Sequence, residues 1–178
     1  APQDAGRAFE RAVASNDAAA QAHFYLGVPL ERLGRTPEAR QELRRAIALD
    51  RNHADALNYL GYLNAEEGVE LPEAEAMIER AIALDPDNGA YIDSLGWVYF
   101  KLGHLPKAIE QLERAATLLS SDPTIYDHLG EAYAKQGNLE KAEQAWEQAV
   151  ELNQDLELVK RKLESLRHRE ASKSEPHF

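Results

Sequence analysis

The chain has 178 residues, of which 44% are apolar, and a formal net charge of −11. The acidic excess argues against nucleic acid or an anionic membrane as the main partner. No apolar run approaches the roughly 20 residues that cross a bilayer, so we expect no direct membrane insertion. Cysteine is absent, which excludes disulfides, thiolate catalysis and Cys-ligated zinc.

Residues 4–14 have the pattern of a short amphipathic helix at the start of the chain. Phe9 and Ala12 precede Leu43 and Ala46 by thirty-four positions each. We therefore predict that residues 1–19 hold the second helix of a repeat whose first helix is missing, which indicates a chain cut from a longer array. The alternative is an intact protein that uses this helix as its N-terminal cap.

A leucine–glycine pair then recurs along the chain, with successive glycines thirty-four, thirty-five and thirty-four positions apart. Two alanine series keep the same period. Because a glycine inside a helix costs about 1 kcal/mol relative to alanine, we expect each glycine to let one helix approach another closely. The three series are Gly27, Gly61, Gly96 and Gly130; Ala39, Ala74, Ala108 and Ala142; and Ala46, Ala81, Ala115 and Ala149.

This period predicts an array of four full repeats, at residues 20–53, 54–88, 89–122 and 123–156. The second repeat holds one additional residue, because Gly61 and Ala74 are thirteen positions apart where the other repeats have twelve. We place this insertion in the turn at residues 67–72, since a turn accommodates an extra residue easily.

The array is followed by a segment that we predict to be a capping helix, residues 157–170. Leu158, Val159, Leu163 and Leu166 fall on one face of this helix, and the opposite face is charged. A terminal repeat needs such a polar outer face. Residues 171–178 are expected to be a disordered tail.

The period and the motif resemble the tetratricopeptide repeat, a helix–turn–helix unit of about 34 residues. The resemblance covers nearly the whole chain. It implies an all-α fold, a right-handed α-solenoid of antiparallel helix pairs. There are departures: His23 and Leu30 stand where aromatic residues are usual, and only Pro86 supplies the usual closing proline.

The stretches at 85–97 and 126–130 also resemble the C-terminal repeats of long bacterial tetratricopeptide proteins. Some of these are periplasmic lipoprotein adaptors that present substrates to a protease. This resemblance implies a bacterial source and a periplasmic or cytoplasmic location, with the periplasm favoured.

The chain shows no catalytic, cofactor-binding or metal-binding motif, and we expect it not to be an enzyme. Asp93, Ser94 and His128 suggest a hydrolase triad, but no nucleophile elbow or oxyanion loop accompanies them. His128 has helical spacing to Asp127 and Glu131 that suits a metal. A single histidine with surface carboxylates is more often packed or solvated.

The resemblance implies that the first helix of each repeat lines a concave groove that binds proteins. We predict a scaffold or adaptor whose partner is a peptide or protein segment with apolar anchors and basic residues. The alternatives are a structural array that associates with itself through open repeat ends, and a protease adaptor. The predicted groove residues are Phe24, Asp55, Asn58, Tyr62, Asp93, Trp97, Phe100, Lys101, Asp127 and Glu131.

The negative charge is concentrated on two repeats. Residues 54–88 carry nine acidic groups and one basic group, and residues 123–156 carry seven and two. Two interpretations stay open: these acids steer a basic partner, or they form a solvated face that keeps the protein soluble.

Overall fold

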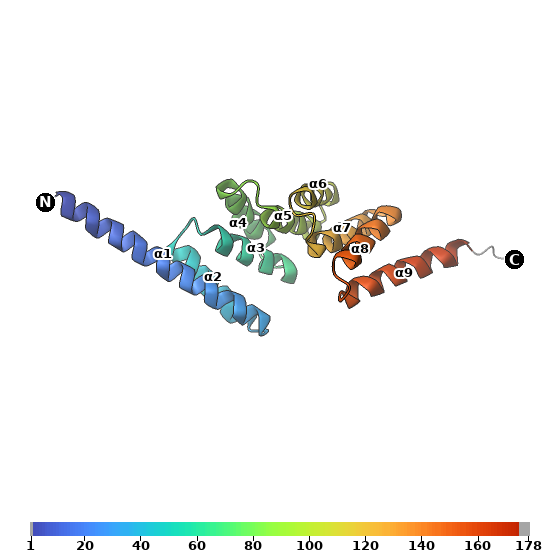
Figure 1. Ribbon diagram of the computed structural model, residues 1–178, viewed down its shortest axis with the longest axis horizontal. Helices are drawn as coiled ribbons and strands as arrows, with labels where there is room; N and C mark the ends of the chain where they lie inside the picture. The colour runs from blue at the N-terminus through green and yellow to red at the C-terminus, as the bar shows by residue number, and fades with distance from the viewer. Residues whose placement is uncertain (1, 175–178) are drawn as a thin grey trace. The chain divides into compact units, whose positions relative to one another are not determined.

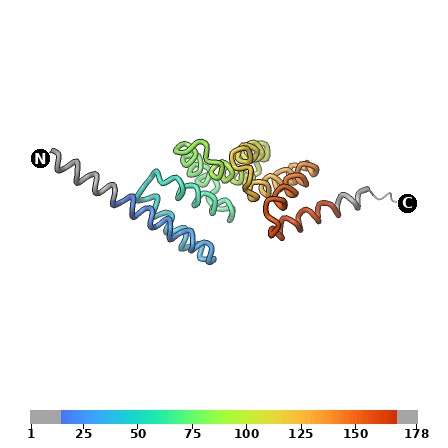
Figure 2. The backbone as a smooth tube through the Cα atoms, viewed as in Figure 1, coloured from blue at the N-terminus to red at the C-terminus, as the bar shows by residue number. Residues whose placement is uncertain are grey.

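The computed structural model is all-α, and the part of the chain that it describes contains no strand. It describes the backbone of residues 2–174 and the side chains of residues 15–168 (Figure 2). Within these residues, no helix has the length and apolar character needed to cross a membrane. The helices form two compact units, residues 1–86 and residues 87–178.

Each unit is a series of helices in which every helix packs against the next one in the chain (Figure 1). The first unit contains α1 (Pro2–Arg32), α2 (Thr36–Leu49), α3 (Ala54–Glu67) and α4 (Leu71–Leu84). The second unit contains α5 (Gly89–Leu102), α6 (Leu105–Leu118), α7 (Pro123–Gln136), α8 (Leu139–Leu152) and α9 (Glu157–Ser174). In the predicted repeats, α1, α3, α5 and α7 are the first helices, and α2, α4, α6 and α8 are the second.

The recurring glycines lie where the two helices of a pair approach most closely. A Cβ atom on Gly96 would lie 2.7 Å from Cγ of Leu112 and 3.2 Å from the backbone oxygen of Ala108. Gly61 has the same relation to Ile78 and Ala74. The first alanine series and the large residue four positions later therefore form the surface that each glycine contacts, which confirms the predicted reason for its absent side chain.

The start of the chain differs from the prediction. Residues 15–20, where we expected the connection between two helices, are helical, and α1 continues through them to Arg32. The prediction of a separate helix at residues 1–19 is therefore wrong. The packing expected of Phe9 and Ala12 lies outside the described side chains.

The additional residue of the second repeat lies in the turn between α3 and α4, as predicted. This connection consists of positions 68–70, whereas α5 and α6 are joined by positions 103 and 104 alone. Glu70, immediately before α4, has φ of +49°, and is the one described non-glycine residue in the left-handed region. Its carboxylate accepts a hydrogen bond from Arg44 at 3.0 Å and one from Asn64 at 3.1 Å, which hold this uncommon conformation.

The last helix packs on α8 through Val159, Leu163 and Leu166, which are all buried. Leu158 is 71% exposed, so its predicted place on the packed face is wrong. The helix also extends to Ser174, past the predicted end at position 170, so the tail predicted at 171–178 begins with helix. Residues 175–178 lie outside the described part of the chain.

One position of α9 differs from the earlier first helices. Glu164 follows Gly130 by one repeat period and is exposed. At this position each earlier first helix has glycine, because the large side chain of its second helix lies against it.

Candidate functional site

The ten predicted groove residues differ widely in exposure. Asp55 is exposed, whereas Asp93 and Trp97 are buried. The other seven are partly buried: Phe24, Asn58, Tyr62, Phe100, Lys101, Asp127 and Glu131. The two buried residues and four of the partly buried ones belong to the second unit, where α5 and α7 lie side by side.

Trp97 is at the centre of an aromatic stack in the second unit. Its ring lies 4.7 Å from that of Phe100 and 4.2 Å from the imidazole of His128, and both are nearly parallel to it. Only 8% of Trp97 is exposed. The prediction that Trp97 is an exposed groove aromatic is therefore wrong, because its flat faces are already occupied by neighbours on α5 and α7.

Asp93 forms a buried pair with His128 on the next first helix. Nδ1 of His128 lies 2.9 Å and 3.1 Å from the two carboxylate oxygens. This bond orients the imidazole against Trp97, so Asp93 is a residue of the repeat interface and was wrongly predicted to be a surface acid. Ser94 donates its hydroxyl hydrogen to the backbone oxygen of Ala90 at 3.0 Å. The geometry of a hydrolase triad is thus absent from these three residues.

Asp127 and Glu131 on α7 are joined to Lys162 of α9. The ammonium group lies 2.7 Å from a carboxylate oxygen of each. Trp146 also donates its indole N–H to Asp127 at 3.0 Å. Burial lowers the pKa of Lys162, but the hydrogen bonds to the two carboxylates raise it by more, so the net shift is upward. The chain therefore already supplies a cation for two acids that we predicted would attract a ligand.

Lys162 was not among the predicted groove residues, although a periodic signal marks it. The fifth residues of α5 and α7 are Asp93 and Asp127, and each pairs with the sixth residue of the following first helix. In both pairs the partners are thirty-five positions apart in the sequence. A search for acids and bases at one period plus one residue would have found both contacts.

Phe100 remains partly exposed beside this stack, with lysines nearby. Nζ of Lys135 lies 4.4 Å from the centre of the Phe100 ring, and Nζ of Lys101 lies 4.8 Å from that of Trp97. Both distances are within the range of cation–π attraction. This part of the first-helix face is aromatic and positively charged; the predicted groove included Phe100 and Lys101 but not Lys135.

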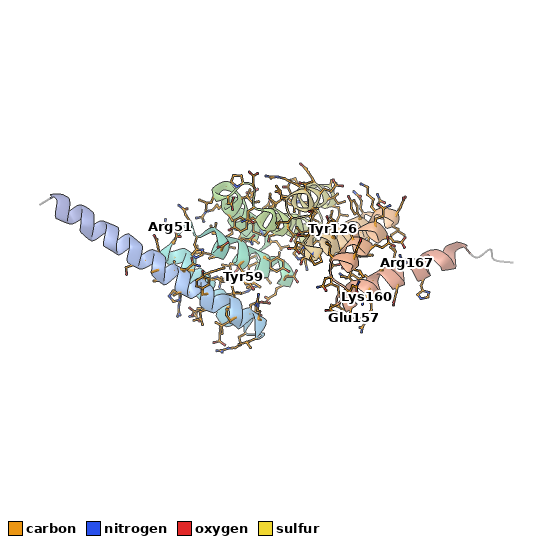
Figure 3. The ribbon with its side chains drawn as sticks, in the orientation of Figure 1. Arg51, Tyr59, Tyr126, Glu157, Lys160 and Arg167 are labelled. Atoms are coloured by element: carbon orange, nitrogen blue, oxygen red, sulfur yellow. The ribbon has the colours of Figure 1, made fainter. Side chains whose placement is uncertain are left out.

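In the first unit, Phe24 of α1 and Tyr59 of α3 form a partly buried aromatic group; Tyr59 is labelled in Figure 3. Their rings meet edge to face at 6.3 Å. The Tyr59 hydroxyl donates to Glu31 at 3.0 Å. Burial, and then the bond to Glu31, raise the pKa of Tyr59 to about 12. Tyr62 packs partly against the core of this unit, and Asp55 and Glu66 are exposed on the same helix, α3.

A pocket of about 450 Å³ lies between α7, α8 and α9. Glu131 and Lys162 form its charged side, and Trp146 and Leu166 its apolar side. The predicted groove residue Glu131 therefore faces a hollow that the capping helix completes. Among the residues with described side chains, no group of three or more His, Cys, Asp or Glu is arranged to hold a metal ion.

The sequence matches three tetratricopeptide family models. One, described as TPR repeat, covers residues 96–137, and two described as Tetratricopeptide repeat cover 123–156 and, in two overlapping matches, 2–53 and 30–89. The chain is a tetratricopeptide repeat protein. Comparison of its sequence with curated proteins gave no match.

Several solved tetratricopeptide structures share this fold. PilF of Pseudomonas aeruginosa is 24% identical, with a TM-score of 0.75, and the alignment covers 89% of this chain and 72% of that one. MamA of Desulfovibrio magneticus RS-1 is 23% identical, with a TM-score of 0.67 and 86% of both chains covered. The first tetratricopeptide domain of Spaghetti (RPAP3), solved with the HSP90 peptide SRMEEVD, is 23% identical, with a TM-score of 0.61, covering 66% of this chain and 93% of that domain.

These likenesses establish an all-α tetratricopeptide solenoid. Proteins of this family are generally scaffolds for protein–protein interaction without enzymatic activity. The buried pairs described above agree with the tetratricopeptide assignment. Most of the polar groups in these pairs form contacts between successive repeats.

Proposed function

We propose that this protein is a non-enzymatic scaffold that binds a segment of a partner protein on the first-helix face of its repeats. Phe100 carries the proposal. Its ring is only partly buried, although the neighbouring Trp97 is almost completely covered. A rigid aromatic surface offers a large apolar contact area at little cost in conformational entropy, which is why such residues dominate binding energies.

The charges around Phe100 favour an acidic segment in the second unit. Asp93 and Asp127 are already paired within the chain, with His128 and Lys162. A ligand that contacts the Phe100 ring meets the ammonium group of Lys135 beside it. We therefore assign to this surface an apolar side chain with a carboxylate nearby. The peptide SRMEEVD, bound to a domain of the same fold, supports peptide binding in general.

The first unit favours a different segment. Tyr62 is partly buried on α3, and Asp55 and Glu66 are exposed on the same helix. The composition of this face fits an apolar anchor accompanied by lysine or arginine, which is the ligand that the sequence predicts. The two units thus differ in the charge of the segment that each prefers.

Selection from a random peptide display library tests the proposal, with the purified full chain as bait. Peptides selected by the wild-type chain should lose at least tenfold in affinity for the Phe100→Ala variant. The matched control is Leu118→Ala, since Leu118 is 40% exposed but lies on a second helix. Circular dichroism and melting curves establish that both variants are folded. Equal binding by the two variants, or an absence of selected peptides, contradicts the proposal.

Charge reversal tests the two ligand classes separately. Lys135→Glu should weaken acidic peptides, and Asp55→Lys should weaken basic ones, each more strongly at low salt because exposed charges are screened. If Lys135→Glu leaves the capture of acidic peptides unchanged, the assignment of the second unit is wrong.

A further inference from the structure

The outward face of α1 in the first unit differs from the same face in the other repeats. Leu26 is 51% exposed, whereas its equivalent in the next repeat, Leu60, is 3% exposed. Tyr25 and Leu33 are also exposed, at 66% and 71%. In the second repeat α2 packs on α3 and covers this face. No helix outside α1 covers the equivalent face of α1 among the side chains that the structure describes.

The sequence of residues 4–14 matches that of a helix that covers such a face. These residues align with α2 at an offset of one repeat period, and a tetratricopeptide family model matches the chain from residue 2. The residues of α2 that pack on the next repeat have apolar counterparts at the same offset. Ala5, Phe9, Ala12 and Val13 correspond to Ala39, Leu43, Ala46 and Ile47.

The continuity of α1 prevents this segment from covering its own chain. In the other repeats a turn reverses the chain between the second helix and the next first helix, but here residues 15–19 are helical. A helix rises about 1.5 Å per residue, so Phe9 and Leu26 are separated by roughly 25 Å along one axis. Residues 4–14, which have the sequence of a covering helix, and the exposed Leu26 face therefore belong to the same continuous helix. Two parts of one continuous helix cannot pack against each other.

We propose that α1 pairs with α1 of a second copy of this chain, in antiparallel orientation. Residues 4–14 of each copy then cover the Leu26 face of the other. The contact is symmetric and closed, as in most homodimers, and exchanges an element that other repeats keep within one chain. In this dimer the exposed face of α1 is covered by a helix whose sequence corresponds to the second helix that covers the same face in the next repeat.

The core of the first unit defines the register of this contact. Leu43 and Ala46 of α2 form a buried cluster with Ala56 and Leu60 of α3. A shift of one repeat period aligns positions 9 and 12 of one copy with positions 22 and 26 of the other. Residues 9 and 26 opposite each other require the twofold axis to pass near residues 17 and 18. Both Asp17 and Ala18 are exposed in the structure.

Sedimentation velocity on the full chain tests the dimer. The wild-type chain should sediment as a dimer that dissociates on dilution, and Leu26→Glu should raise the dissociation constant at least tenfold. Leu158→Glu is the control, because Leu158 is 71% exposed on α9, and this variant should stay dimeric. Circular dichroism confirms folding. A wild-type chain that is monomeric at 100 µM, or a Leu26→Glu variant that remains dimeric, overturns the proposal.

Cross-linking tests the register. The chain has no cysteine, so Ala18→Cys introduces a single thiol close to the expected twofold axis. A short bismaleimide should convert this variant to a covalent dimer. Thr117→Cys on α6, which is also an exposed site, should remain monomeric on a denaturing gel. Equal yields from the two variants overturn the antiparallel α1 contact.

Discussion

Replacing Lys162 by methionine tests whether the capping helix is held by charge as well as by apolar packing. The substitution keeps most of the aliphatic stem and removes the ammonium group, which lies 2.7 Å from both Asp127 and Glu131. Breaking a fully buried ion pair costs about 3–5 kcal/mol, and an exposed pair contributes about 1 kcal/mol or less. Here the lysine side chain is 30% exposed and the two carboxylates 26% and 33%.

This intermediate exposure gives an expected loss of about 2 kcal/mol, between the values for buried and exposed pairs. For a chain of this size that corresponds to a fall of about 4–8 °C in melting temperature. The matched variant is Lys160→Met on the same helix, whose partner Glu157 is 68% exposed, and which should leave the melting temperature almost unchanged because exposed pairs contribute little. Thermal unfolding followed by circular dichroism measures both. Equal shifts for the two variants would refute the role assigned to Lys162.

Three further predictions concern packing and ionisation. Gly96→Ala should destabilise the chain by about 1–3 kcal/mol in urea unfolding, because the new methyl group meets Leu112; a stabilised variant would show that helix propensity dominates instead. Truncation after Leu156 uncovers the α8 surface that buries three apolar side chains of α9, and should lower stability by roughly 4–9 kcal/mol; an unchanged melting curve would reject the cap. The raised pKa of Tyr59, about 12, implies a stabilising contribution that is complete below the ordinary tyrosine pKa of about 10 and is lost as the pH rises through 12. Absorbance titration should therefore show a late tyrosinate component that Tyr59→Phe removes, and a titration identical in both chains would contradict this.

The periodic signals predicted the fold well because they arise from contacts that each repeat makes in the same way. Gly61 and Gly96 recur since every helix pair needs the same close approach. The start of α1 was predicted wrongly because that prediction relied on the same repeat pattern. Residues 4–14 have the sequence of a second helix, but the sequence at 15–19 has no proline or glycine to end a helix, and α1 continues through it.

The candidate site was harder to predict because surface position does not reveal what a neighbouring repeat supplies. Asp93 and Asp127 occupy groove positions, but His128 and Lys162 approach them from the next first helix. Likewise, the position of Trp97 on α5 did not show that its ring would be sandwiched. Only the spacing of one period plus one residue indicated in the sequence that Asp93 and Asp127 would be paired.

The paired acids and bases have a consequence for how the length of this protein changes during evolution. Deletion of residues 123–156 would move Lys162 to the sequence position of His128, so that Asp93 would again face a basic side chain. Val159 and Leu163 would take the positions of Ile125 and Leu129, which are buried in the present chain. A whole repeat can therefore be lost or duplicated in one genetic event, and α9 still fits the repeat that precedes it.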